Sequence, residues 1–86
     1  MLYPYVELPN ETIITHSEIK EDQSILIHFE QPYDDGFREA RIQLPSYKWL
    51  YNDGFSEKQI KSFIDFAHEN VETVYKHAKE IGANKG

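Results

Sequence analysis

The last third of the sequence carries the pattern of one long amphipathic helix. Its apolar residues recur at steps of three and four, so at roughly 100° per residue they fall within one stripe about 120° wide. The stripe comprises Ile60, Phe63, Ile64, Ala67, Val71, Val74, Tyr75, Ala78 and Ile81. Such a helix needs an apolar surface to cover, and a chain of 86 residues leaves only its first two-thirds to provide one.

Local signals set both ends of this helix. The tetrapeptide SEKQ at 56–59 is a capping box, in which the serine hydroxyl and the glutamine side chain satisfy backbone N–H groups reciprocally. Phe55 precedes the cap, where it can pack on the first turn as a hydrophobic staple. Gly82 stands where a left-handed C-cap residue belongs. We therefore predict a helix over 56–82 and a frayed tail at 83–86.

Four segments in the first half of the chain are rich in β-branched and aromatic residues. They cover residues 2–8, 12–19, 24–30 and 37–44. The polar connections KEDQ at 20–23 and DDG at 34–36 are too short for parallel crossovers, so they favour antiparallel pairing. Pro4 cannot donate to a ladder, so the first segment is an edge strand or a strand start, and whether it pairs at all stays open. We predict a three- or four-stranded antiparallel β-meander over 1–44.

The aromatic connector at 45–55 joins the sheet to the helix. Pro45 stops the ladder, and the spacing of Tyr47, Leu50 and Tyr51 is that of one short helical turn. The whole chain is thus predicted to be a single α+β domain. In it the antiparallel sheet is followed by a short helical turn and by one long C-terminal amphipathic helix packed on one sheet face.

The composition is that of an ordinary small globular domain and excludes several classes of site. Apolar residues make up 40% and charged residues 28%, which argues against disorder. There is no cysteine, so disulfides, thiolate zinc sites and cysteine nucleophiles are excluded, and a reducing cytoplasmic location fits. The N-terminus lacks a signal-peptide pattern, and no segment approaches the roughly 18 apolar residues of a membrane span, so we expect no membrane association.

The net charge of −6 is concentrated in the first two-thirds of the chain. Residues 1–23 hold five acidic side chains against one lysine, whereas the lysines and carboxylates balance after residue 55. Nucleic-acid binding depends on neutralising phosphates with Lys and Arg, so this balance disfavours it and suits a basic protein partner better. A net negative charge of this size is also explained by the need to keep a small protein soluble.

Candidate catalytic and metal-binding groups are few. His68 and Glu72 share a helix flank that faces water, without the second histidine of a zinc-protease signature. His16 and His28 would face each other across the two strands if the 20–23 hairpin centred on Asp22. A metal site there would need a third ligand from a residue near them in the sequence. Those candidate third ligands are Glu18, Glu30 and Asp34. A change of register by one residue would place Ile27 opposite residue 16 instead and remove the pair.

Other motifs of catalysis are missing from the sequence. The adjacent Asp34 and Asp35 belong to a turn, because a calcium loop needs alternating oxygen ligands and a closing glutamate. No serine lies in a glycine-flanked elbow, and no glycine cluster forms a phosphate-binding loop. We therefore expect a protein without catalytic residues, cofactor or metal, and keep a small metal-dependent hydrolase as a less favoured alternative.

The aromatic residues are the best candidates for a contact surface, although a small domain also needs large side chains in its core. The interaction candidates are Tyr33, Tyr47, Trp49, Tyr51, Phe66 and His77. Tyr33 lies in a loop and Trp49 falls off the face of its helical turn, so these two are expected to be exposed. Phe66 lies outside the main stripe with His77 near it, which implies a second contact with a dimer mate or a partner.

These observations favour a small, acidic, non-catalytic protein of the cytoplasm that acts as an interaction or regulatory module. Its acidic surface would bind a protein partner or a second copy of the chain. The alternative is a nucleic-acid-binding module in which aromatics of the sheet and connector stack on bases beside Arg38, Arg41 and Lys48. The two hypotheses differ in whether those three cations converge beside exposed aromatic residues or lie among carboxylates.

The capping box makes a direct prediction about stability. Replacing Ser56 with alanine removes the hydroxyl that caps the helix, so the free energy of unfolding should fall by about 1 kcal/mol. Thermal melts of the wild type and of Ser56→Ala measure the loss. An unchanged melting temperature would contradict the predicted start of the helix.

Overall fold

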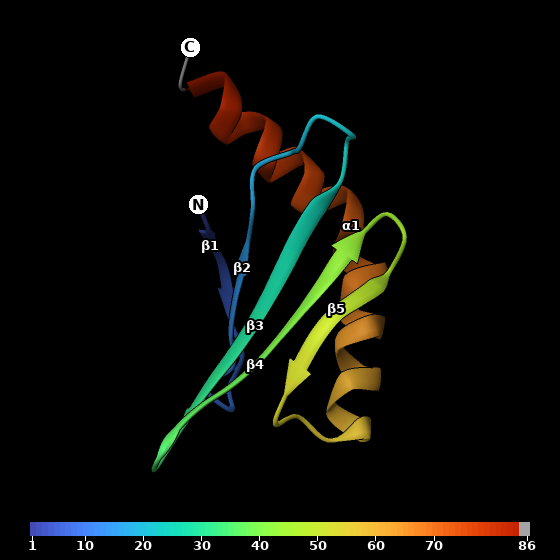
Figure 1. The fold of residues 1–86 in the computed structure, drawn as a ribbon. Coiled ribbons are helices and arrows are strands. Elements are labelled where there is room, and N and C mark those ends of the chain that lie inside the picture. Colours follow the sequence, from blue (N-terminus) through green and yellow to red (C-terminus); the bar gives the residue numbers. More distant parts are fainter. Residues whose placement is uncertain (85–86) are drawn as a thin grey trace.

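The computed structural model describes residues 1–84 and contains a five-stranded antiparallel sheet followed by one helix (Figure 1). The elements are β1 (Tyr3–Glu7), β2 (Ile13–His16), β3 (Ile25–Tyr33), β4 (Gly36–Leu44), β5 (Lys48–Asp53) and α1 (Glu57–Asn84). The spatial order β1-β2-β3-β4-β5 follows the chain, and each neighbouring pair is antiparallel. The α+β class with an antiparallel sheet is as predicted, but the sheet has five strands rather than three or four.

The fifth strand occupies the connector, where the sequence analysis predicted a helical turn. Tyr47 adopts a left-handed φ of 59°, and β5 then pairs with β4 from Lys48 onward. A register shift leaves Leu50 as an extra residue in this pairing. The prediction of a helical turn was wrong because an isolated turn gains little, whereas the unpaired edge of β4 offers a ladder of hydrogen bonds to a segment rich in β-formers.

Residues 3–7 do pair in the sheet, which answers the question that the sequence left open. Pro4 lies in β1 opposite Thr15, and β1 is an edge strand, where a residue without an N–H is tolerated. A register shift between Pro4 and Val6 makes Tyr5 the extra residue of a bulge. The Tyr5 hydroxyl donates a hydrogen bond of 3.0 Å to the Asn70 side chain, which ties the edge strand to α1.

The turn between β2 and β3 lies where it was expected, but a bulge separates it from β2. Lys20 N donates to the Ser24 carbonyl at 2.9 Å, so the turn is centred on Asp22. Ser17 N donates to the Leu26 carbonyl, also at 2.9 Å. Between these two bonds the first strand has two residues, 18 and 19, whereas the second has only Ile25. The register of the two strands therefore slips by one residue.

This slip separates the two histidines that the sequence analysis considered as a pair. His16 lies opposite Ile27, and Thr15 lies opposite His28. Because side chains alternate along a strand, His16 points to the helix side of the sheet and His28 to the other side. A metal or acid–base site shared by His16 and His28 is therefore incompatible with the fold.

The core lies between one face of the sheet and α1, which runs behind the sheet in Figure 1. Phe29 of β3 is fully buried and stacks on Phe63 of α1 with ring centroids 4.3 Å apart. Phe55 meets Phe63 edge-on at 4.9 Å. The fully buried apolar cluster comprises Ile14, Ile25, Ile27, Phe29, Ala40, Ile42, Leu44, Phe55, Phe63, Ala67, Val74 and Ala78.

The predicted start of α1 is confirmed, and its predicted end is wrong. Ser56 N donates to Gln59 Oε1 at 3.0 Å and Gln59 N donates to Ser56 Oγ at 3.2 Å, which is the reciprocal capping box. Gly82 does not have a positive φ, and the helix continues to Asn84. A glycine is tolerated within a helix at modest cost, so it is a permissive rather than a sufficient end signal. The remaining residues of the expected tail, 85–86, lie outside the described part.

The face of the sheet away from α1 is not covered by another element of the described chain, and we call it the open face. By strand alternation the residues of β2 to β5 on this face are Ile13, Thr15, Leu26, His28, Glu30, Glu39, Arg41, Gln43, Lys48, Tyr51 and Asp53. Pairing of β3 with β2 ends at Glu30, and pairing of β4 with β5 ends at Glu39. Residues 31–38 therefore project as a two-stranded ribbon, which we call the hairpin arm (Figure 1, lower left). Within residues 1–84, no helix combines the length and hydrophobicity required to cross a lipid bilayer.

Two phenylalanines provide a matched test of this architecture. Phe63 is 3% exposed in the core, whereas Phe37 is 57% exposed on the hairpin arm. Phe63→Ala should lower the free energy of unfolding by about 3 to 5 kcal/mol, and Phe37→Ala by less than about 0.5 kcal/mol. Urea denaturation of both variants measures the difference. Equal losses would contradict the placement of the helix stripe in the core.

Candidate functional site

Two of the predicted contact residues, Tyr33 and Tyr51, are exposed, with 48% and 40% of their surface accessible. Tyr33 ends β3 at the tip of the hairpin arm, and the Arg38 guanidinium lies 4.6 Å from its ring centroid. Tyr51 lies on the open face opposite Arg41. Both rings are accessible to a binding partner.

Trp49 and Tyr47 are half-buried and pack within the chain. Helical spacing led us to expect an exposed Trp49, but as a strand residue it lies on the helix side, with its ring centroid 5.9 Å from that of Phe29. Its buried Nε1 has no hydrogen-bond partner among the described residues. Tyr47 stacks on His68 of α1 with centroids 3.8 Å apart. These two side chains therefore contribute to the joint between the connector and α1.

Phe66 has its second contact inside the chain. It is half-buried and meets Tyr5 and Phe29 edge-on, at centroid distances of 6.1 and 6.2 Å. Phe66 lies outside the main helix stripe, and Tyr5, the extra residue of the β1 bulge, packs against it on that flank of α1. The off-stripe position of Phe66 therefore does not require a partner, and its role in an interface stays a prediction.

His77 pairs with His16, a residue 61 positions away in the sequence. His16 is fully buried, and its Nε2 lies 2.6 Å from Nδ1 of His77. The other ring nitrogen of His16, Nδ1, lies 2.8 Å from the Ser17 carbonyl oxygen. A carbonyl only accepts, so His16 Nδ1 carries a proton. Neutral His16 then accepts at Nε2, and His77 donates from Nδ1.

Burial lowers the pKa of His16 below its ordinary value of 6.5, and the nearby His77 adds to this, while the Ser17 carbonyl acts in the opposite direction. The cause is that a charged imidazolium loses its hydration inside the core. His16 is therefore neutral in the folded protein at neutral pH. Its pairing with His77 links β2 to α1 through a single shared proton.

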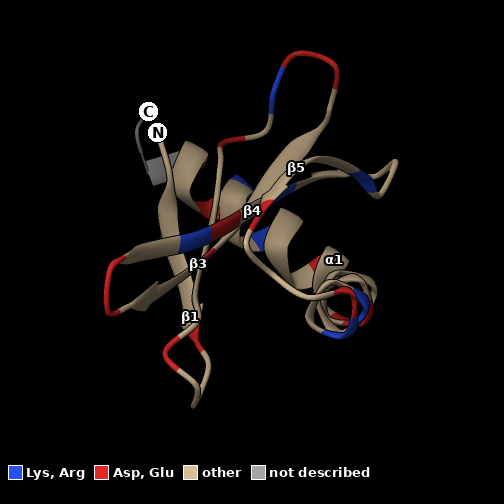
Figure 2. Ribbon diagram, turned by 60° about the horizontal axis from the view of Figure 1, so that its bottom comes forward, with Lys and Arg blue, Asp and Glu red and all other residues tan. Residues whose placement is uncertain are grey.

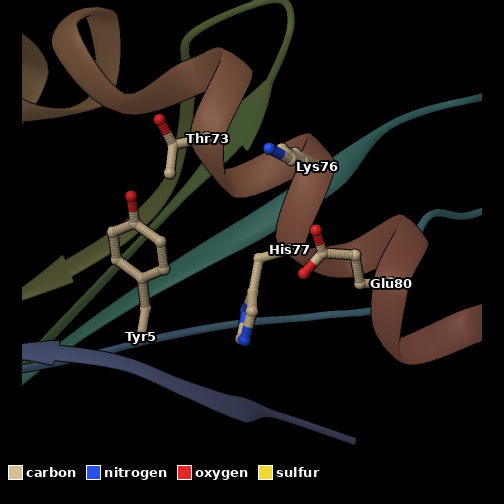
Figure 3. Close-up of a pocket in the computed structure, with 5 residues that line it drawn as sticks. All are labelled: Tyr5, Thr73, Lys76, His77 and Glu80. Carbon is tan, nitrogen blue, oxygen red and sulfur yellow. The ribbon is translucent and has the colours of Figure 1, made fainter. Parts of the chain in front are cut away.

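Beside His77 lies an open pocket of about 300 Å³. Figure 3 shows its lining of Tyr5, Thr73, Lys76, His77 and Glu80. The Tyr5 hydroxyl is already engaged with Asn70, and one cation and one carboxylate offset each other at the rim. This lining does not single out a ligand class.

The three cations of the nucleic-acid hypothesis do not converge. Arg38 lies on the helix side of the hairpin arm over Tyr33, and Arg41 points to the open face. Lys48, opposite Gln43 at the start of β5, shares the open face with Arg41 and is exposed, so only Arg38 lies on the other side of the sheet. The guanidinium of Arg41 lies 3.4 Å from His28, which in turn lies beside Glu30 and Glu39. This arrangement does not provide the continuous basic surface that a phosphate backbone needs.

The open face holds a compact cluster of His28, Glu30 and Glu39. Nε2 of His28 lies 4.0 Å from Glu30 Oε1 and 3.7 Å from Glu39 Oε1. The two glutamates are directly opposite each other in the β3–β4 register. Burial lowers the pKa of His28 and Arg41 lowers it further, whereas Glu39 and Glu30 act in the opposite direction. Groups of this kind, an imidazole and two carboxylates, are common ligands of divalent metal ions.

Sequence reasoning had named Glu30 as a ligand candidate but missed Glu39. The signal was present in the turn, because a hairpin with Asp34 and Asp35 as its two loop residues pairs Tyr33 with Gly36. Counting back along both strands from that pair places Glu39 opposite Glu30. The other motifs stay apart from this cluster: His68 and Glu72 are exposed on α1, and the two aspartates form the tip of the arm.

No protein family matches the chain, and neither a curated protein nor a solved structure shows significant similarity to it.

The depressed pKa of His16 predicts a loss of stability in acid. The unfolded chain takes up a proton near the ordinary value of 6.5, whereas folded His16 does not, so protons favour unfolding. The stability that neutral His16 contributes to the fold is fully present above pH 6.5 and is lost as the pH falls below it. Between about pH 7.5 and about pH 5.5 the free energy of unfolding should fall by up to about 1.4 kcal/mol for this site.

Urea denaturation at the two pH values measures this dependence. His16→Gln should reduce the pH effect, although the variant is less stable throughout. Lys61→Gln, a change at an exposed residue of α1, should leave the pH effect unchanged. A wild type that is equally or more stable at the lower pH would contradict the assignment.

Proposed function

We propose that this chain is a non-catalytic interaction module of the cytoplasm that binds a basic segment of a partner protein. The contact surface is the hairpin arm, residues 31–38, together with the adjoining open face. Binding, rather than catalysis, is supported by exposed aromatics and unneutralised carboxylates that gather on one projecting element.

The observation that carries the proposal is the arm itself. Its strands extend beyond β2 and β5, so their outer edges have no strand partner within residues 1–84 and can add an extended peptide. Phe37 and Tyr33 are 57% and 48% exposed at its tip. Large aromatic side chains in exposed positions are typical anchors of protein interfaces.

The charge of the arm selects the kind of partner. The ribbon formed by β3 and β4 has a red, acidic tip in Figure 2. In the sequence of the arm the acidic residues are Asp34 and Asp35, and Arg38 is the single basic residue. Glu30 and Glu39 flank the arm at its base. Arg38 is engaged with Tyr33 and donates a hydrogen bond of 3.2 Å to Gln31. A lysine- and arginine-rich segment would complement this surface and be attracted to it.

A fluorescein-labelled peptide of about eight Lys and Arg residues with one central Trp is a suitable probe. Its anisotropy is measured against protein concentration at about 50 mM and about 300 mM salt. Phe37→Ala, and separately the double change Asp34→Asn with Asp35→Asn, should each weaken binding by more than about tenfold. The double change keeps residue types that suit a turn.

The matched control is Glu69→Gln with Glu72→Gln, which removes the same charge from the exposed flank of α1. It should change the affinity by less than about threefold. An equal loss in both double variants would show that the peptide senses only net charge and would contradict the assignment to the arm. A dimer in sedimentation equilibrium that Phe37→Glu dissolves would replace the basic partner with a second copy of the chain.

A further inference from the structure

Three side chains on the open face lie close enough to hold one metal ion. We propose that His28, Glu30 and Glu39 form a binding site for a divalent transition-metal ion, with Zn²⁺ as the best fit. The proposal does not rest on the proposed function, because metal binding is a property of the isolated chain.

The geometry requires only small movements. One ligand atom from each of the three residues lies within 4.8 Å of the other two. Ligand bonds of about 2.0 to 2.2 Å directed to tetrahedral corners place ligand atoms roughly 3.3 Å apart. The two separations from His28 Nε2 to the carboxylate oxygens are already 3.7 and 4.0 Å. The glutamate side chains are 34% and 40% exposed, so rotation about their own bonds can close the remaining gap.

The burial and the surroundings of His28 independently indicate that it is a ligand. It is only 6% exposed although it lies on the uncovered side of the sheet. Its Nε2 is directed at the two carboxylates, yet no hydrogen bond of this nitrogen is present among residues 1–84, the nearest carboxylate oxygen being 3.7 Å away. An imidazole held this close to two carboxylates, with the facing nitrogen hydrogen-bonded to neither, is placed as a ligand that shares a metal ion with them.

The two carboxylates point to a missing positive charge. Glu30 and Glu39 lie directly opposite each other across β3 and β4, and like charges in this position destabilise a sheet. A bound divalent cation converts the repulsion into shared coordination. Arg41 does not substitute for it, because its guanidinium approaches the opposite nitrogen of the ring, Nδ1 of His28, at 3.4 Å.

The neighbours of Nδ1 fix which tautomer binds the ion. When Nε2 binds metal, Nδ1 carries the proton and needs an acceptor. The Tyr51 hydroxyl oxygen lies 3.4 Å from Nδ1 and can accept it, whereas Arg41 cannot. Tyr51 is thus a positioning residue for the ligand, and Arg41 opposes the ion by its charge.

The ligand set defines the class of metal. Imidazole favours zinc, iron, nickel and copper over magnesium and calcium, and two carboxylates bring the ion close to neutrality. Three protein ligands leave at least one position for water or for a group of a partner. Mg²⁺ should therefore not compete with Zn²⁺ at equal concentration.

Isothermal titration of the purified protein with Zn²⁺ tests the site. We expect saturable binding of one ion per chain, weakened by about tenfold or more in Glu39→Gln and in Glu30→Gln. Arg41→Gln should strengthen binding, because it removes a cation from the neighbourhood. His77→Asn is the control, since it removes a histidine of the other cluster and should leave the affinity unchanged.

Nitrogen-15 spectra of the imidazole rings provide a second readout that does not depend on variants. Zn²⁺ should shift Nε2 of His28 and leave His16 unaffected. The proposal is overturned if the wild type shows no saturable Zn²⁺ binding, or if Glu39→Gln and Glu30→Gln bind as tightly as the wild type. Binding that is lost in His77→Asn but kept in Glu39→Gln would also overturn it, by placing the ion at the other histidine pair. Failure here leaves the peptide experiment unaffected, because that experiment is done without metal.

Discussion

The stack of Phe29 on Phe63 joins the sheet to the helix, and the other exposed and buried surfaces follow from it. The rings lie 4.3 Å apart at the centre of a cluster that spans β2 to β4 and α1. One helix covers one face of a sheet, so the same contact that builds the core leaves the opposite face uncovered. β3 and β4 are longer than their neighbours, so residues 31–38 extend beyond the sheet as the hairpin arm.

Strand register decides which polar groups meet. The bulge after β2 puts His16 under the helix and His28 on the open face, so each histidine has a different partner. His16 meets His77 in the core, where burial keeps it neutral. His28 meets two carboxylates that the β3–β4 register places opposite each other. One extra residue in a strand thus converts a single possible histidine pair into two separate sites.

The proposed partner surface and the proposed metal site lie on neighbouring parts of the same face. Glu30 and Glu39 belong to the metal site at the base of the arm, whereas Phe37 and the two aspartates lie at its tip. A bound divalent ion would neutralise the charge at the base and leave the acidic tip unchanged. The two proposals share Glu30 and Glu39, but their tests change different residues, so they are separable by experiment. A metal ion with an open coordination position would also accept a ligand from a docked partner.

The sequence by itself determined the local features: the start of α1 at its capping box, the apolar stripe of the helix, the antiparallel strands and the turn at Asp34 and Asp35. Each depends on residues a few positions apart, where spacing and backbone preference act directly. Only the tertiary structure decided that the connector forms β5, that Trp49 packs inward, that His16 meets His77 and that Glu39 joins His28. These depend on contacts between distant segments, and a free strand edge or a one-residue bulge overrides local preference because it changes many hydrogen bonds and contacts at once.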